Sequence, residues 1–245
     1  MIWQKPSLHP VLSKNQVHLW RANLDLLTAE VDSLATILSS DELERASKFC
    51  FAEHRRRFVV TRAILRQLLG NYLDISPEDL KFDYGNLGKP QLVKSDLVSP
   101  LQFNISHSQE YALFGFTNHH LIGVDIEYLK EMPDAVKIAQ RFFSPREFSL
   151  ISNSAIDEQP KLFFKLWTAK EAYLKAIGVG LTGSLASVDI SIHQDGQTSL
   201  LSIQGDLIAA NRWSIYSCVP AADYIATVAI KSNITEQQIV FWSWN

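Results

Sequence analysis

Two carboxylates lie close together on one predicted strand. Residues 122–127 read Ile-Gly-Val-Asp-Ile-Glu, an alternation that places the apolar side chains in a core and Gly123, Asp125 and Glu127 on the opposite face. Two carboxylates on one face repel each other unless a cation lies between them, and their hard oxygen atoms suit Mg2+. Gly123 would leave room for a ligand on that face. An ordinary strand with a solvated acidic face gives the same alternation, so the pair alone leaves both interpretations open.

A third carboxylate lies on a predicted helix over residues 163–178. Its apolar residues recur at helical spacing, and Gly178 supplies the expected stop. Glu171 and Lys175 are four residues apart on one flank, which a simple exposed ion pair would also explain. Lys170 falls within the apolar stripe, where a lysine is costly to bury unless it is paired or reaches a wet cavity.

Basic side chains gather on a helical segment predicted over about residues 42–70, with a break near residues 52–54. Arginine suits phosphate because its planar fork makes bidentate bonds to phosphate oxygens. Basic residues on a helix are nevertheless more often a solvated face. Between positions 44 and 66 the basic residues are Arg45, Lys48, Arg55, Arg56, Arg57, Arg62 and Arg66, against Glu44 and Glu53.

Further polar residues stand where strands and loops meet. Lys89 follows two glycines in a tight loop over residues 85–90. Ser106, His107 and Ser108 close a predicted strand, and they would place three hydrogen-bonding side chains where the backbone leaves the sheet. A surface lysine is ordinarily without function, and a lone histidine is more often structural than catalytic.

The remaining patterns predict mainly antiparallel sheet. Residues 111–116 and 121–127 read as the two strands of a hairpin around residues 117–120. Later strands are expected at residues 188–192, 213–216 and 224–229, with turns at residues 195–196 and 219–220.

A faint internal repeat relates the two halves of the chain. Aligning Gly70 with Gly178 puts Arg62 opposite Lys170 and puts an alanine opposite Glu171. Residues 40–42 then correspond to residues 144–147. Each half is expected to be a helix pair with strands. Only the second half retains the carboxylate, so one metal site is expected at the junction of two similar lobes.

The overall composition narrows the class of function. The chain has 245 residues, 47% of them apolar, and a formal charge of -3, which suits a soluble globular protein without global attraction to nucleic acid or anionic membrane. The N-terminal residues lack the layout of a signal peptide, and no apolar run approaches the ~18 residues needed to span a bilayer. A cytoplasmic location is therefore expected. Cys50 and Cys218 are far apart, so neither a disulfide framework nor a zinc site is indicated.

In combination, these motifs closely resemble the surfactin-type (Sfp-type) 4'-phosphopantetheinyl transferases. The resemblance runs from about residue 40 to residue 181 and rests on residues 103–108, 122–127, 142–144 and 167–175, in order and at the family's spacing. It implies an α+β fold with a pseudo-twofold pair of similar lobes, each a helix pair packed on a small, mainly antiparallel sheet. Residues 1–119 would form the N-terminal lobe and residues 120–245 the C-terminal lobe, with coenzyme A in the cleft between them.

The resemblance also implies a reaction and a site. Phosphopantetheine would move from coenzyme A to a serine of an apo acyl or peptidyl carrier protein, releasing 3',5'-ADP. Asp125, Glu127 and Glu171 would hold Mg2+, and Glu171 or a metal-held water would take the serine proton. Lys175 and His107 would contact the phosphates.

Other positions match the family's nucleotide contacts. Arg45, Lys89 and Ser106 would secure the nucleotide and its 3'-phosphate, with Arg57 as a further candidate. Glu42 stands where other members carry a basic residue. Glu147 matches a family glutamate near the site, and Lys170 would face the cleft between the lobes, where it can reach an acid or a phosphate.

Two other functions fit some of the same residues. A different Mg2+-dependent phosphoryl-transfer enzyme, such as a nuclease or phosphoesterase, could use the same acids, although the negative charge and the compact basic patch disfavour a nucleic-acid track. A catalytically silent module that binds carrier proteins would be favoured by a missing metal ligand, and none is missing. The duplicated lobes suggest that a monomer contains a whole site.

Overall fold

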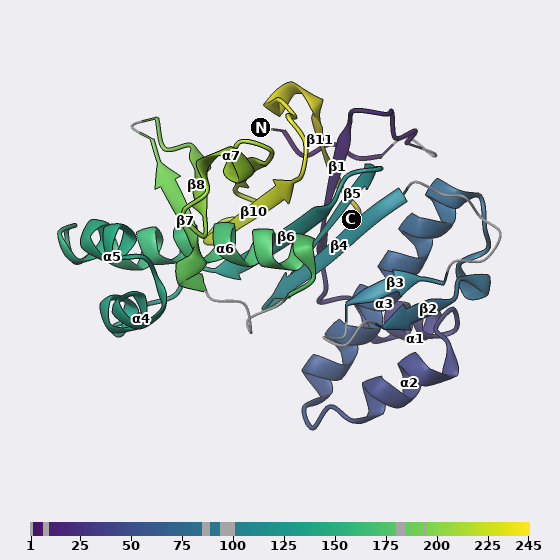
Figure 1. The fold of residues 1–245 in the computed structure, drawn as a ribbon. Helices are drawn as coiled ribbons and strands as arrows, with labels where there is room; N and C mark the ends of the chain where they lie inside the picture. The colour runs from purple at the N-terminus through teal and green to yellow at the C-terminus, as the bar shows by residue number, and fades with distance from the viewer. Residues whose placement is uncertain (1, 7–9, 85–88, 94–100, 180–184, 194) are drawn as a thin grey trace.

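The structure is a computed structural model that describes residues 2–6, 10–84, 89–93, 101–179, 185–193 and 195–245. It is an α+β fold of two lobes, as predicted. Helices α1–α3 and the β2–β3 ribbon lie on one side of the central strands, and α4–α6 with the β7–β8 ribbon lie on the other (Figure 1). No helix among the described residues is long and apolar enough to cross a membrane.

The N-terminal lobe is built on a four-stranded sheet in the order β11-β1-β5-β4. The β1–β11 pair is parallel, whereas β1–β5 and β5–β4 are antiparallel. The helical segment predicted over residues 42–70 is two helices, α2 and α3, separated by residues 48–51. The elements are β1 (Val17–Asn23), α1 (Thr28–Ala35), α2 (Ser40–Ser47), α3 (Ala52–Leu73), β2 (Phe82–Tyr84), β3 (Pro90–Leu92), β4 (Leu101–Ser108), β5 (Tyr111–Asn118) and β11 (Ile239–Ser243).

The C-terminal lobe is built on a three-stranded antiparallel sheet in the order β6-β10-β9, with a separate β7–β8 ribbon. The later strands predicted from the sequence are therefore confirmed. The elements are β6 (Ile122–Tyr128), α4 (Ala135–Phe142), α5 (Pro145–Ser152), α6 (Gln159–Ile177), β7 (Val188–Ile192), β8 (Thr198–Ile203), α7 (Leu207–Ala210), β9 (Ser214–Cys218) and β10 (Tyr224–Ile230).

The predicted hairpin between β5 and β6 is wrong. β5 pairs with β1 and β4, whereas β6 pairs with β10 in the second sheet. A Cβ atom on Gly115 of β5 would lie 2.7 Å from a methyl carbon of Val124 and 3.0 Å from one of Ile122. β6 therefore packs across the face of β5 through these side chains, and the absence of a side chain at Gly115 permits the close approach.

The core is divided into three layers by the two sheets. One layer packs α3 on the outer face of the first sheet, and another packs α6 on the outer face of the second. The third lies between the sheets and includes Leu19, Leu113, Val124, Ile126 and Val228. Each lobe thus contributes a helix and a sheet, and the two sheets are held together by a shared apolar layer.

A buried ion pair ties α6 into the C-terminal lobe. The Lys170 ammonium lies 2.7 Å from a carboxylate oxygen of Glu147, and both side chains are 0% exposed. Lys170 also donates to the carbonyls of Leu185 and Val188. Glu147 accepts a hydrogen bond from the backbone N–H of Ile190 at 2.8 Å. The pair therefore connects α5, α6 and β7, and it supplies the partner that a lysine in an apolar stripe requires.

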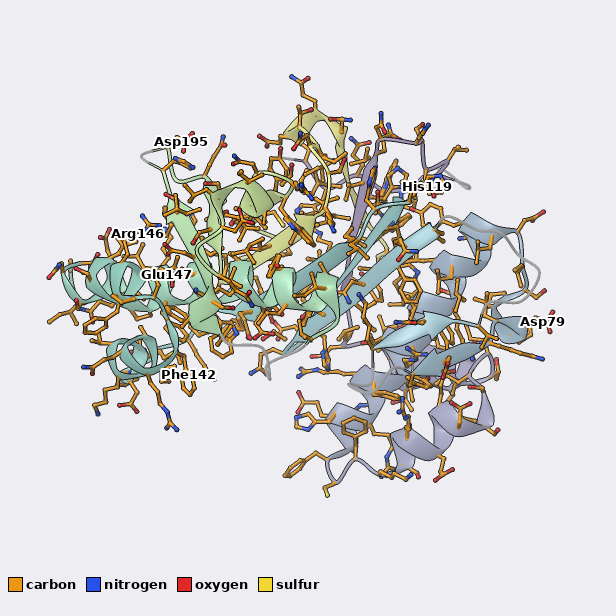
Figure 2. All side chains as sticks on the ribbon, in the orientation of Figure 1. Asp79, His119, Phe142, Arg146, Glu147 and Asp195 are labelled. Atoms are coloured by element: carbon orange, nitrogen blue, oxygen red, sulfur yellow. The ribbon has the colours of Figure 1, made fainter. Side chains whose placement is uncertain are left out.

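The expected placement of Lys170 and Glu147 at the inter-lobe cleft is wrong. Figure 2 shows Glu147 beside Arg146 at the α5 end of the molecule, away from the central strands. Lys170 does reach an acid, but that acid lies inside the C-terminal lobe because the side chain points from α6 toward α5 and β7.

The internal repeat aligns Arg62 with Lys170 and residues 40–42 with residues 144–147, and a similar buried ion pair lies in the N-terminal lobe. Glu42, at the start of α2, is buried and accepts from Arg62 Nε at 2.6 Å and from Arg66 Nε at 2.7 Å. Glu42 and Glu147 each belong to a capping box that begins a helix, with Ser39 and Ser144 as the respective caps. Both lobes therefore use the first turn of one helix to hold a buried cation of the next.

Removal of one partner from the buried pair should strongly destabilise the fold. The substitution Lys170→Met leaves the Glu147 carboxylate buried without a cation, and we expect the free energy of unfolding to fall by about 3–5 kcal/mol. Urea denaturation of the purified variant measures this loss. Lys48→Met removes a lysine from an exposed pair with Glu44 and is the matched control. Equal denaturation midpoints for the two variants would contradict the structural role given to Lys170.

Candidate active site

A cavity of about 590 Å3 lies between the lobes. Its wall contains every residue predicted to hold the metal ion or to contact coenzyme A, except Arg57. The residues that the fold brings together there are Arg45, Lys89, Ser106, His107, Asp125, Glu127, Glu171 and Lys175. They come from α2, β4, β6, α6 and the segment that precedes β3, so tertiary structure assembles them from distant parts of the chain.

The three acids meet because α6 lies directly on β6. A Cβ atom on Gly123 would lie 2.0 Å from the Ala172 carbonyl oxygen and 2.4 Å from the Ala176 backbone nitrogen. The helix backbone therefore occupies the space that the sequence suggested for a ligand, and that expectation is wrong. Gly123 instead permits the close contact that brings Glu171 of α6 to the strand.

The acids are buried and only partly satisfied by the protein. Asp125 and Glu171 are both buried, and their Oδ2 and Oε1 atoms have no hydrogen-bond partner among the described residues. Burial, followed by the negative charge of Asp125, raises the pKa of Glu171 to about 7. The same two causes raise the pKa of Glu127. Such like-charge crowding is costly, and it is typical of a site that receives a cation or a proton.

Lys175 partly compensates the acidic group. Its ammonium donates to Asp125 Oδ1 at 2.6 Å and to Ser106 Oγ at 2.7 Å. Ser106 in turn donates to Asp125 Oδ1 at 2.9 Å. Lys175 lies one helical turn after Glu171, and because it faces the same cavity it can also reach an anion there.

Alternate side chains of β4 fix β6 in position. Asn104 accepts from the Val124 backbone N–H at 2.9 Å. Ser108 donates to Glu127 at 3.0 Å and accepts from the backbone N–H of Tyr128 at 3.1 Å. With Ser106, these side chains occupy every second position of the strand. Sequence reasoning missed Asn104 and Ser108 as positioning residues, although polar residues at i, i+2 and i+4, with apolar Phe103 and Ile105 on the other face, are a readable signal.

The Ser-His-Ser run closes a strand, as predicted. Ser106, His107 and Ser108 are the last three residues of β4, paired with Leu113, Ala112 and Tyr111. His107 lines the cavity. Desolvation, followed by the charge of Lys175, lowers the pKa of its imidazole, which favours a neutral ring able to donate or accept a hydrogen bond.

The N-terminal wall of the cavity carries positive charge that no acid neutralises. Arg45 has no carboxylate partner among the described residues, and its guanidinium carbon lies 3.8 Å from the centroid of the Tyr84 ring. Lys89 donates to the Lys175 carbonyl at 2.8 Å, and burial lowers the pKa of its ammonium to about 8. Two cations are thus available to an anion, opposite the acids of the C-terminal wall.

Arg57, predicted to contact the nucleotide, does not line the cavity. It makes a two-point contact with Asp25, at 2.8 and 2.9 Å, and a further ion pair with Glu53 at 2.6 Å. These carboxylates use the donors that the sequence suggested for a phosphate.

Comparisons with known proteins agree with the geometry. The family model described as the 4'-phosphopantetheinyl transferase superfamily matches residues 121–229, and the N-terminal model of 4'-phosphopantetheinyl transferase matches residues 22–117. The chain is 41% identical to the 4'-phosphopantetheinyl transferase HetI of a Nostoc species, over 93% of each chain. The chain belongs to the 4'-phosphopantetheinyl transferase family. It is also 33% identical to the transferase Sfp of Bacillus subtilis, over 70% of this chain and 74% of that one. Membership of this family bears out the resemblance that the motifs indicated.

The similarity of this chain to a solved structure is lower than its similarity to HetI and Sfp. Holo-[acyl-carrier-protein] synthase from Neisseria meningitidis matches with a TM-score of 0.36 and 21% identity, over 46% of this chain and 97% of that one. Among the described residues, no group of three or more His, Cys, Asp and Glu side chains that could hold a metal ion was found. The magnesium ligands named from the sequence therefore remain a prediction.

The raised pKa of Glu171 predicts a pH-dependent effect on stability. A carboxyl group whose pKa is higher in the folded chain destabilises the fold as pH rises, because the unfolded chain releases the proton first. In the absence of divalent cations, Glu171→Gln should therefore gain stability over the unsubstituted protein between about pH 4.5 and pH 7, with no further gain above that range.

Urea denaturation in the presence of EDTA at several pH values measures this difference. Glu78→Gln, at an exposed position outside the cavity, is the matched control and should show no such trend. A stability difference between Glu171→Gln and the unsubstituted protein that is constant from pH 5 to pH 8 would show that folding does not raise the pKa of Glu171.

Proposed function

We propose that this protein transfers the 4'-phosphopantetheine group of coenzyme A to a serine of an apo carrier protein, leaving 3',5'-ADP. The observation that carries the proposal is the charge layout of the cavity. Its C-terminal wall bears three crowded acids, and its N-terminal wall bears two cations, Arg45 and Lys89, that have no acidic partner in the part of the chain that the structure describes. A diphosphate with a further phosphate at the other end of a nucleotide matches this layout, since fixed positive groups and a divalent cation can each take part of its charge.

The acidic cluster suits Mg2+ by the chemistry of its donors. Asp125, Glu127 and Glu171 offer hard carboxylate oxygens, and two buried oxygen atoms of the cluster have no hydrogen-bond partner within the described ranges. Mg2+ is commonly held by a few carboxylates together with waters and substrate phosphates. When bound, Mg2+ would neutralise charge on the diphosphate and on the developing leaving group. Burial and then the charge of Asp125 raise the pKa of Glu171, and a bound cation would offset the second of these effects.

The cavity residues have distinct tasks in this proposal. Lys175 neutralises a phosphate oxygen, and His107 donates a hydrogen bond to the diphosphate. Arg45, Lys89 and Ser106 hold the nucleotide. Glu171 lines the cavity beside these groups and accepts the proton of the attacking serine hydroxyl. The serine oxygen bonds to the phosphorus that carries pantetheine, the bond from that phosphorus to the bridging oxygen breaks, and 3',5'-ADP leaves with the electron pair.

The partner in this proposal is an acyl or peptidyl carrier protein that presents the serine. One chain supplies both walls of the cavity, which supports a monomer as the functional unit. The two alternative functions differ in product. A nuclease or phosphoesterase would hydrolyse its substrate, and a silent module would bind the carrier without modifying it.

One assay tests the proposal directly. Purified protein is incubated with Mg2+, coenzyme A and an apo acyl carrier protein, and intact mass spectrometry reports the carrier. We expect the carrier to gain the mass of one phosphopantetheinyl group. Carrier of unchanged mass, with the unsubstituted protein and every candidate carrier class, would overturn the proposal.

The Glu171→Gln variant tests the assigned roles. Loss of the carboxylate should reduce transfer by at least about 100-fold, as expected for a group that acts as a base, while coenzyme A still binds through the opposite wall. Calorimetric titration with coenzyme A provides the binding measurement. Turnover close to that of the unsubstituted protein would show that Glu171 has neither proposed role.

A further inference from the structure

Tyr84 stands between the cavity and the buried charges of the N-terminal lobe. One face of its ring packs on the Arg45 guanidinium, 3.8 Å from the ring centroid. Its hydroxyl accepts a hydrogen bond from Arg62 Nη2 at 3.1 Å. Both Tyr84 and Arg45 line the cavity. Tyr84 lies at the end of β2, outside the motifs that the sequence singled out.

Glu42 is not available to neutralise Arg45. Glu42 lies three residues earlier on α2, a spacing at which an acid and an arginine often pair. However, Arg62 and Arg66 engage one carboxylate oxygen each, at 2.6 and 2.7 Å. Arg45 is therefore held by the face of an aromatic ring, which attracts a cation without using its N–H donors.

The ring itself is anchored to the core. Arg62, which donates the hydrogen bond to the Tyr84 hydroxyl, is buried and forms an ion pair with the buried Glu42. The Arg62 guanidinium also lies 4.6 Å from the ring centroid of Phe82, on the same strand as Tyr84. A series of contacts thus runs from Glu42 through Arg62 and Tyr84 to Arg45. It holds a guanidinium at the cavity wall whose N–H donors have no partner among the residues that the structure describes.

We propose that Tyr84 is a positioning residue that makes this protein select a donor with a 3'-phosphate, coenzyme A over 3'-dephospho-coenzyme A. The inference rests on the proposed function. The acids and Lys175 of the opposite wall are suited to the diphosphate, so the remaining phosphate of the same molecule falls to the wall that carries Arg45. Tyr84 acts through Arg45 because its ring restricts the guanidinium to one orientation, in which the planar fork can make two bonds to a phosphate.

The test compares the two donors in the carrier-modification assay. For the unsubstituted protein we expect a KM for dephospho-coenzyme A at least about tenfold above that for coenzyme A, the size expected for a charge-assisted hydrogen bond. Tyr84→Leu should reduce this ratio to about threefold or less by raising the KM for coenzyme A, with little effect on kcat. Tyr84→Phe keeps the ring and should keep most of the preference. Thermal melts of both variants establish that they are folded.

A double-substitution comparison separates positioning from simple packing. Arg45→Gln should itself remove the preference for coenzyme A. If Tyr84 acts through Arg45, adding Tyr84→Leu to Arg45→Gln should leave the ratio unchanged. A further fall in the double variant, or a Tyr84→Leu variant with the original ratio, would overturn the inference while leaving phosphopantetheine transfer intact. A protein that modifies the carrier with neither donor would instead overturn the proposed function.

Discussion

The site depends on one close contact, that of the α6 backbone with Gly123 of β6. No side chain separates the helix from the strand at this point, since even a methyl group on Gly123 would lie 2.0 Å from the Ala172 carbonyl oxygen. The contact brings Glu171 into the same cavity wall as Asp125 and Glu127, and burial then makes their shared negative charge costly. The crowding, the raised pKa of Glu171 and the unpartnered oxygens all follow from the distance at which this helix packs on this strand.

Crowding of Asp125, Glu127 and Glu171 destabilises the fold, and polar contacts on either side of these acids hold α6 and β6 in place. Lys170 and Glu147 anchor α6 on its far side, and the polar side chains of β4 hold β6 from the near side. The N-terminal lobe uses the same arrangement of a capping-box glutamate and a buried cation, in Glu42 and Arg62. Because Glu42 is fully used by buried arginines, Arg45 keeps its charge for the cavity. In both lobes, the buried ion pairs engage some of the charged side chains, and other charged side chains line the cavity.

Much of the site could be predicted because its signals are local. The alternation in residues 122–127 places Asp125 and Glu127 on one face, and the helical spacing of residues 163–178 brings Glu171 and Lys175 to one flank. Errors arose where distant contacts decide the outcome. The partner of Lys170 lies on another helix, Arg57 is taken by Asp25, and Gly115 lets β6 cross β5 where a hairpin was expected. The prediction that Gly123 leaves room for a ligand is wrong, because the sequence does not show that the backbone of α6 occupies that space.

The central claim, that the crowded acids on α6 and β6 form a divalent-cation site, is tested most directly by anomalous diffraction. Crystals grown with Mn2+ and coenzyme A, measured at the manganese edge, would locate the ion without reference to activity. The account predicts one strong anomalous peak bounded by Asp125, Glu127 and Glu171, and its loss in Asp125→Asn crystals. A peak elsewhere in the cavity, or a cluster of acids that remains without metal while coenzyme A is bound, would contradict it.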